Sequence, residues 1–164
     1  MDVNSPAYKV PVSVLVLVHT ADLRVLLIER ADRPGFWQSV TGSQDAGETL
    51  QQTAVRELRE ETGLAAERYR LVDWQKQTVF EIYPHWRHRY APGVTHNTEN
   101  VFSLELPAPV DVVLAPREHL AYAWLPWREA ADKAFSRSNA AAIRELPSRV
   151  KSWRGTPQDG PGGT

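Results

Sequence analysis

The sequence contains no cysteine, which excludes a disulfide framework and a thiol nucleophile. It has no apolar run near the ~20 residues that a membrane-spanning helix needs, and its first residues lack the pattern of a signal peptide. Neither sign of charge predominates: the net charge is −1 and the pI is near 6.5, so nothing draws the whole chain to nucleic acid or membrane. We therefore expect a cytoplasmic protein without a nucleic-acid, membrane or protein partner.

The chain is long enough to bury a core. Its 164 residues fit a single domain, which we expect to span residues 5–153. The last stretch, residues 154–164, is rich in glycine and proline and is expected to be a disordered tail.

Alternating and continuous apolar stretches predict an α/β sandwich with a mixed sheet. Residues 10–18 are almost continuously apolar and β-branched, as in a central strand that is covered on both faces. Ser138 or Asn139 is expected to cap the last helix. Further strands are expected at residues 25–28, 69–80 (one strand or two), 99–106 and 121–125, and helices at residues 49–61, 127–134 and 138–146.

The helix expected at residues 49–61 carries carboxylates in an unfavourable place. Glu57 and Glu61 lie within about 40° of each other at the edge of its apolar face. They form a like-charge i,i+4 pair, which destabilises a helix. They also lie close to its C-terminal end at Gly63, where the helix dipole disfavours negative charge.

No basic residue lies three or four positions from Glu57 or Glu61, although Arg56 can pair with Glu60. Carboxylates without a cation in the chain are typical of a site for an external cation, and oxygen ligands select Mg²⁺ or Mn²⁺. For the helix taken alone, a solvated acidic face is the alternative interpretation.

The loop before the helix favours the metal site. From Gly42 the sequence reads GSQDAGETLQQTAVRELREETGL, with Glu48 after five residues and RELREETGL after seven more. This stretch resembles the Nudix box, and every defining position is filled. The resemblance implies a loop–helix–loop that presents metal ions to a substrate diphosphate, with metal ligands Glu57, Glu60 and Glu61. It also implies supporting residues, of which the last two brace the loop against the helix: Gly42, Glu48 and Arg56.

Aromatic and basic residues are interleaved along residues 80–90, FEIYPHWRHRY. Such side chains can stack on a flat ring and bind phosphate groups. The alternatives are a solvated hairpin, a platform for single-stranded nucleic acid, and a zinc site formed by His85 and His88.

Several stretches outside the box resemble one branch of the Nudix family, the bacterial enzymes that act on dihydroneopterin triphosphate. They are YK at residues 8–9, FWQSVTG at 36–42, FEI at 80–82, RHRYAPGVT at 87–95, NTE at 97–99 and EHLAY at 118–122. The resemblance implies Mg²⁺-dependent hydrolysis of 7,8-dihydroneopterin triphosphate to the monophosphate and pyrophosphate in folate biosynthesis, with Mn²⁺ as a substitute ion.

The same resemblance assigns roles to further residues. Glu118 would join the metal ligands or act as the general base, a role for which Glu60 is the other candidate. The implied substrate pocket is lined by Lys9, Arg30, Thr41, Phe80, Glu81, Ile82, Tyr83 and Ser136. Without the resemblance, Thr41 and Ser136 would be interpreted as ordinary turn or cap residues.

Three other functions fit parts of the sequence. The nearest is a pyrophosphohydrolase for oxidised dGTP or another (deoxy)nucleoside triphosphate, because pterin and guanine share a hydrogen-bonding edge. The others are a non-catalytic nucleic-acid module and a metal-dependent interaction domain. Both of these would leave the glutamates of the box without a catalytic use.

Overall fold

Strand β1 (Val12–Thr20) is the central strand of a seven-stranded mixed sheet in the computed structural model, which describes residues 8–155. On one side it runs parallel to β6 (His96–Leu106) along its whole length. On the other side its first half pairs antiparallel with β4 (Val40–Ser43), and β2 (Arg24–Arg30) joins it only at His19. Strands β4 and β2 therefore share one edge of β1.

The other strands extend this centre in both directions. Along the main path the order is β3-β2-β1-β6-β5, and β7 pairs with β2. The remaining elements are β3 (Trp37–Gln38), α1 (Leu50–Thr62), η1 (Ala66–Arg68), β5 (Arg70–Glu81), η2 (Pro84–Arg89), β7 (His119–Pro126), α2 (Trp127–Lys133) and α3 (Arg137–Gly155). The expected α/β sandwich with a mixed sheet is confirmed. No helix in the described part of the chain is long and apolar enough to cross a membrane.

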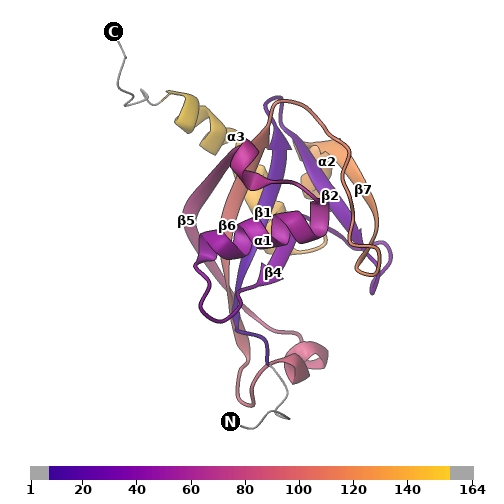
Figure 1. Cartoon of the computed structure of the whole chain (residues 1–164), viewed down its shortest axis with the longest axis vertical. Coiled ribbons are helices and arrows are strands. Elements are labelled where there is room, and N and C mark those ends of the chain that lie inside the picture. The colour runs from indigo at the N-terminus through magenta and orange to yellow at the C-terminus, as the bar shows by residue number, and fades with distance from the viewer. Residues whose placement is uncertain (1–7, 156–164) are drawn as a thin grey trace.

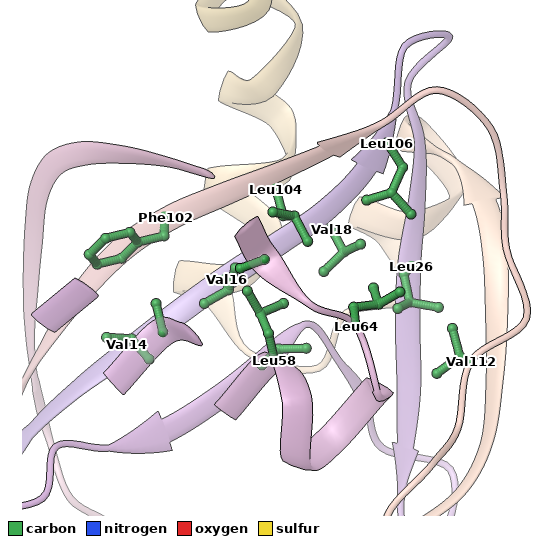
Figure 2. Close-up of a cluster of buried hydrophobic side chains, with 13 residues drawn as sticks. Val14, Val16, Val18, Leu26, Leu58, Leu64, Phe102, Leu104, Leu106 and Val112 are labelled. Carbon is green, nitrogen blue, oxygen red and sulfur yellow. The ribbon is translucent and has the colours of Figure 1, made fainter. Parts of the chain in front are cut away.

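Helices cover both faces of the sheet (Figure 1). Because successive residues of a strand point to opposite faces, β1 contributes to two cores. Val14, Val16 and Val18 pack with Leu58 of α1 in the cluster that Figure 2 shows. The alternate residues of β1 pack instead with α2 and α3. This double burial explains why the strand is almost continuously apolar.

Two features of α3 differ from the sequence-based expectation. Its first turn is capped by Ser136, whose hydroxyl accepts a hydrogen bond from the Asn139 N–H at 3.1 Å, and not by Ser138 or Asn139. The Asn139 side chain is occupied elsewhere, because it bonds the backbone and hydroxyl of Ser39. The helix was also expected to end at residue 146, before Pro147.

Helix α3 instead continues past Pro147 to Gly155, because Val150 stays buried on the same face as Leu146. Arg154 and Gly155 are therefore helical, although the expected tail began at residue 154. The rest of that tail, residues 156–164, and the expected start of the domain at residue 5 lie outside the described residues. Smaller differences occur at β1, which was expected at residues 10–18, and at β6, which begins before the expected residue 99.

Candidate active site

Helix α1 is held in place at both ends by its own sequence. The Thr49 hydroxyl accepts from the Gln52 N–H, and the Gln52 side chain accepts from the Thr49 N–H, which completes a capping box. Gly63 ends the helix in the left-handed region at a φ of 73°, a conformation that favours glycine. Ala54 and Leu58 on the inner face of the helix are fully buried. The last turn, with its glutamates, is thereby fixed beside β4.

Glu61 is a buried carboxylate held by groups from two strands. Its side chain is 5% exposed. One oxygen accepts from the Thr41 N–H of β4 at 3.2 Å, and the other lies 3.2 Å from Nε2 of His119 on β7. Burial raises the pKa of Glu61, and the His119 contact opposes this rise. The Glu61 carboxylate therefore lies between β4 and β7.

Glu118 and His119 complete a small group around Glu61. Each of the three side chains offers a ligand atom, and these atoms all lie within 4.8 Å of one another. Within residues 8–155, no other group of three or more acidic, histidine or cysteine side chains is arranged to hold a metal ion. His85 and His88, which were considered as a zinc site, therefore belong to no such group.

Glu57 lies on the same side of α1, next to Arg56. Its carboxylate lies 2.8 Å from the Arg56 guanidinium. Burial and the charge of Glu61 nevertheless raise its pKa to about 7. The sequence was interpreted as offering no cation to Glu57 or Glu61, and for Glu57 this was wrong. Arg56 reaches its direct neighbour, and His119 comes from a strand that is distant in sequence.

Glu60 points away from this group. Its side chain is 55% exposed and lies 3.3 Å from Arg56, as expected for an i,i+4 pair. Among the predicted metal ligands, Glu60 and Glu118 are exposed, in contrast to Glu57 and Glu61.

Arg56 and Glu48 connect the loop to the helix. The Arg56 guanidinium donates to both Glu48 oxygens, at 2.8 and 3.0 Å, and to the Ser43 carbonyl at 3.0 Å. Glu48 also accepts from the Asp45 N–H and the Thr53 hydroxyl. The Arg56 hydrogen bonds hold the pKa of Glu48 well below its usual range. The geometry is that of a brace across the loop.

A single cavity of about 1460 Å³ brings the predicted residues together. Of the residues that the resemblance assigned to the site, only Glu48 is absent from its wall. The wall includes Lys9, Arg30, Thr41, Gly42, Arg56, Glu57, Glu60, Glu61, Phe80, Glu81, Ile82, Tyr83, Glu118 and Ser136. Two of these hydroxyls already have backbone partners: Thr41 donates to the Val14 carbonyl, and Ser136 caps α3.

Basic residues gather around one indole ring at the edge of this cavity. The guanidinium groups of Arg30, Arg33 and Arg89 lie 5.1, 5.6 and 6.0 Å from the centre of the Trp86 ring. Arg30 is also fixed by Asp32, to which it donates two hydrogen bonds. The Lys9 N–H donates to the Arg89 carbonyl, which brings a further ammonium group to the same side.

Among the other titratable residues of the cavity, His119 and Glu99 had been given no role from the sequence. His119 directly follows Glu118, and Glu99 is a carboxylate within a strand. The signal for Glu99 was its place in the NTE stretch at residues 97–99, one of the segments that carried the resemblance. The signal for His119 was its adjacency to a candidate ligand, but only the pairing of β7 with β2 shows that it reaches Glu61.

The carboxylates of this site fit a hard divalent cation. Oxygen ligands suit Mg²⁺ or Mn²⁺, and Glu57, Glu61 and Glu118 supply carboxylate oxygens. Burial, together with the neighbouring carboxylates, raises the pKa values of Glu57 and Glu61, so their charged forms are only partly compensated by groups of the chain. A bound cation would supply that compensation.

We expect the metal-free protein to lose stability as the pH rises from about 4.5 to about 7. The folded-state pKa of Glu57 is raised above its ordinary value of 4.5, so folding favours the protonated form, and its stabilisation is lost as the pH rises through the folded pKa. The shift corresponds to on the order of 3 kcal/mol. Thermal unfolding in EDTA at pH 5 and pH 8 measures this loss, which should be smaller in Glu57→Gln. Parallel curves for the two proteins would contradict this explanation.

Comparison with known proteins agrees with this site. A family model described as the NUDIX domain matches residues 9–146. The chain is 50% identical over 142 residues to dihydroneopterin triphosphate diphosphatase of Escherichia coli (strain K12), covering 85% of this chain and 93% of that protein. It is 42% identical over 141 residues to the Haemophilus influenzae protein of the same name, covering 84% and 88%.

Solved structures show the same relationship. The E. coli dihydroneopterin triphosphate pyrophosphohydrolase has a TM-score of 0.80 at 49% identity, with 87% of this chain and 99% of that chain covered. A C. elegans Ap4A hydrolase complex, at a TM-score of 0.67 and 20% identity over 87% and 99% of the two chains, shares the fold. With the family model matching most of its length, the chain belongs to the Nudix family.

Proposed function

We propose that this protein hydrolyses 7,8-dihydroneopterin triphosphate to 7,8-dihydroneopterin monophosphate and pyrophosphate, a step of folate biosynthesis. The observation that carries the proposal is the 50% identity, over nearly the full length of both chains, to an E. coli protein named for this activity. The cavity supports it, because carboxylates and basic groups line the same space as the aromatic residues Phe80 and Tyr83. As expected from the sequence, the protein would act on a small-molecule substrate in the cytoplasm.

Within this proposal, Glu57, Glu61 and Glu118 would hold Mg²⁺, or Mn²⁺ in its place, with the exposed Glu60 as a further ligand. When bound, the ion neutralises phosphate charge and polarises the phosphoryl group. His119 orients Glu61 through the 3.2 Å contact of its Nε2.

The remaining groups of the cavity bind and position the triphosphate. Arg30 has a planar guanidinium that suits two phosphate oxygens, and Lys9 supplies a compact positive charge. Glu118 is exposed at the cavity wall, where a carboxylate can take the proton of an attacking water. Glu60 is the alternative base, because it is also exposed and lines the same cavity.

The pterin triphosphate is expected to exceed every standard deoxynucleoside triphosphate in kcat/KM, with dGTP the best of these. Pterin and guanine present the same amino-pyrimidinone edge. A pocket that hydrogen-bonds this edge rejects adenine and the pyrimidines, because each unpaired buried polar group costs about 1–3 kcal/mol. The measurement is pyrophosphate release with Mg²⁺ across a panel that includes oxidised dGTP and ADP-ribose.

The panel also separates the alternative functions. If oxidised dGTP is the best substrate, the protein is a nucleotide-sanitising member of the same family. If dATP or ADP-ribose is preferred, the assignment reduces to the family alone. An absence of turnover on all compounds would favour a binding module.

A further inference from the structure

Buried polar side chains of β6 lie on the sheet face that is turned towards α3. Asn97 and Glu99 are 3% and 6% exposed, and both line the cavity described above. Glu99 lies opposite Ser13 of β1 on one side and opposite Thr78 of β5 on the other. The neighbouring apolar residue of this face in β6 is Val101, which packs with α3. The polar groups therefore lie in the floor of the cavity and not on the outer surface.

Asn97 and Glu99 each have a hydrogen-bond acceptor that no donor satisfies. Oε1 of Glu99 and Oδ1 of Asn97 are buried and have no partner. Asn97 is oriented by its other end, because its Nδ2 donates to the Ser13 hydroxyl at 2.7 Å. Burial raises the pKa of Glu99, and a hydrogen bond from Ser138 opposes the rise. Unsatisfied buried acceptors are rare and costly, so two of them at the wall of one cavity indicate that a ligand supplies donors.

The proposed substrate has donors that match this arrangement. The pyrimidinone half of a pterin carries N3–H and the 2-amino group side by side, and a carboxylate accepts two such parallel hydrogen bonds well. The surrounding wall is apolar at Leu15, Val101 and Ala142 and includes the ring of Phe80. A flat heterocycle fits between such surfaces while its polar edge meets Glu99.

The distance from Glu99 to the glutamates of the predicted metal site suits the length of the substrate. Glu99 of β6 lies opposite Ser13 of β1, and Ser13 lies opposite Ser43 of β4. Two strand spacings separate β6 from β4, or about 10 Å. Glu61 contacts the same strand at the Thr41 N–H. With the pterin edge at Glu99, the three-carbon chain of the substrate would bridge the distance to the phosphate site.

We propose that Glu99, with Asn97 beside it, is the specificity residue that accepts hydrogen bonds from the N3–H and 2-amino groups of the pterin ring. The inference rests on the proposed function and extends it to a residue outside the Nudix box. It assigns ring recognition to β6 and leaves phosphate binding to the glutamates and basic groups.

The test exchanges one hydrogen-bonding pattern for another. Glu99→Gln replaces two acceptors by one acceptor and one donor. That pattern matches a 2-oxo ring, which offers N3–H and a carbonyl, and no longer matches the 2-amino ring. Binding of neopterin monophosphate and of its 2-oxo counterpart is measured by calorimetry in EDTA, so the readout does not depend on turnover. Glu105→Gln is the matched control on the same strand, because Glu105 pairs with Arg154 outside the cavity.

We expect the wild type and Glu105→Gln to prefer the 2-amino ligand by about tenfold or more, and Glu99→Gln to lose or invert that preference. If the wild type hydrolyses the pterin triphosphate but Glu99→Gln keeps the original preference, the role of Glu99 is overturned and the proposed function stands. A wild type that binds both ligands equally also overturns it, whether or not the variant folds. A wild type that neither binds pterin nor hydrolyses its triphosphate overturns the proposed function as well.

Discussion

Glu61→Gln is expected to lower kcat/KM at least about 100-fold while the fold is retained. Changes to residues that merely support a metal ligand typically cost 10–100-fold, and Glu61 is itself placed to contact the cation. Glutamine keeps the shape of the side chain but removes its negative charge. Its amide group can satisfy only one of the donors that now meet Glu61, the Thr41 N–H and His119. The measurement is steady-state kinetics over a Mg²⁺ titration, with circular dichroism as the check on folding.

Glu60→Gln is the comparison variant on the same turn of α1. Its side chain is 55% exposed, whereas that of Glu61 is 5% exposed. If Glu118 is the general base and Glu60 only an exposed further ligand, Glu60→Gln should lower kcat/KM clearly less than Glu61→Gln does. An equally inactive Glu60→Gln would transfer the role of base to Glu60. Near-wild-type turnover in Glu61→Gln would contradict the assignment of the metal site.

Gly42→Ala is expected to reduce activity at least about tenfold with little loss of stability. A Cβ atom at this position would lie 2.1 Å from the carboxyl carbon of Glu57, which is far inside contact distance. The atoms in conflict belong to the end of a flexible side chain, so Glu57 can move aside at low cost. The movement displaces the Glu57 carboxylate from its present position, however, and misplacing a catalytic group by about 1 Å can cost 10²-fold.

The stability of the same variant distinguishes this explanation from misfolding. The melting temperature of Gly42→Ala should stay close to that of the wild type, and the Mg²⁺ concentration for half-maximal activity should rise. The double variant Gly42→Ala with Glu57→Ala removes the steric conflict but should remain inactive. An active Gly42→Ala protein would show that Glu57 has freedom to work from another position.

The sequence predicted best what depends on neighbouring residues. The helix of the box was expected at residues 49–61 and is found at Leu50–Thr62, because Thr49 and Gly63 are local start and stop signals. The double coverage of β1 also followed from its own composition. The end of α3 could not be read in this way. Pro147 is a local stop signal, and the burial of Val150 against the sheet overrides it.

The contacts of the site were less accessible to sequence reasoning. The partner of Glu61 is His119, and no periodicity relates a helix to a strand so distant in the chain. The resemblance implied that Arg56 braces the loop with Glu48, as found, but helical spacing alone paired Arg56 only with Glu60 and missed its contact with Glu57. The proposed role of Glu99 rests on the unsatisfied acceptors of Asn97 and Glu99 and on the cavity beside them. These exist only when β1, β5 and β6 are paired.

The parallel pairing of β1 with β6 also determines when the protein can become an enzyme during its synthesis. Strand β1 is made early, but its parallel neighbour begins only at His96, and β7, which carries His119, begins later still. Pairings between such distant segments form slowly compared with local ones. A nascent chain that has emerged from the ribosome only as far as residue 110 would contain the entire Nudix box, yet it would lack Glu118 and the histidine that holds Glu61. Catalytic competence therefore arises only after most of the chain has been translated.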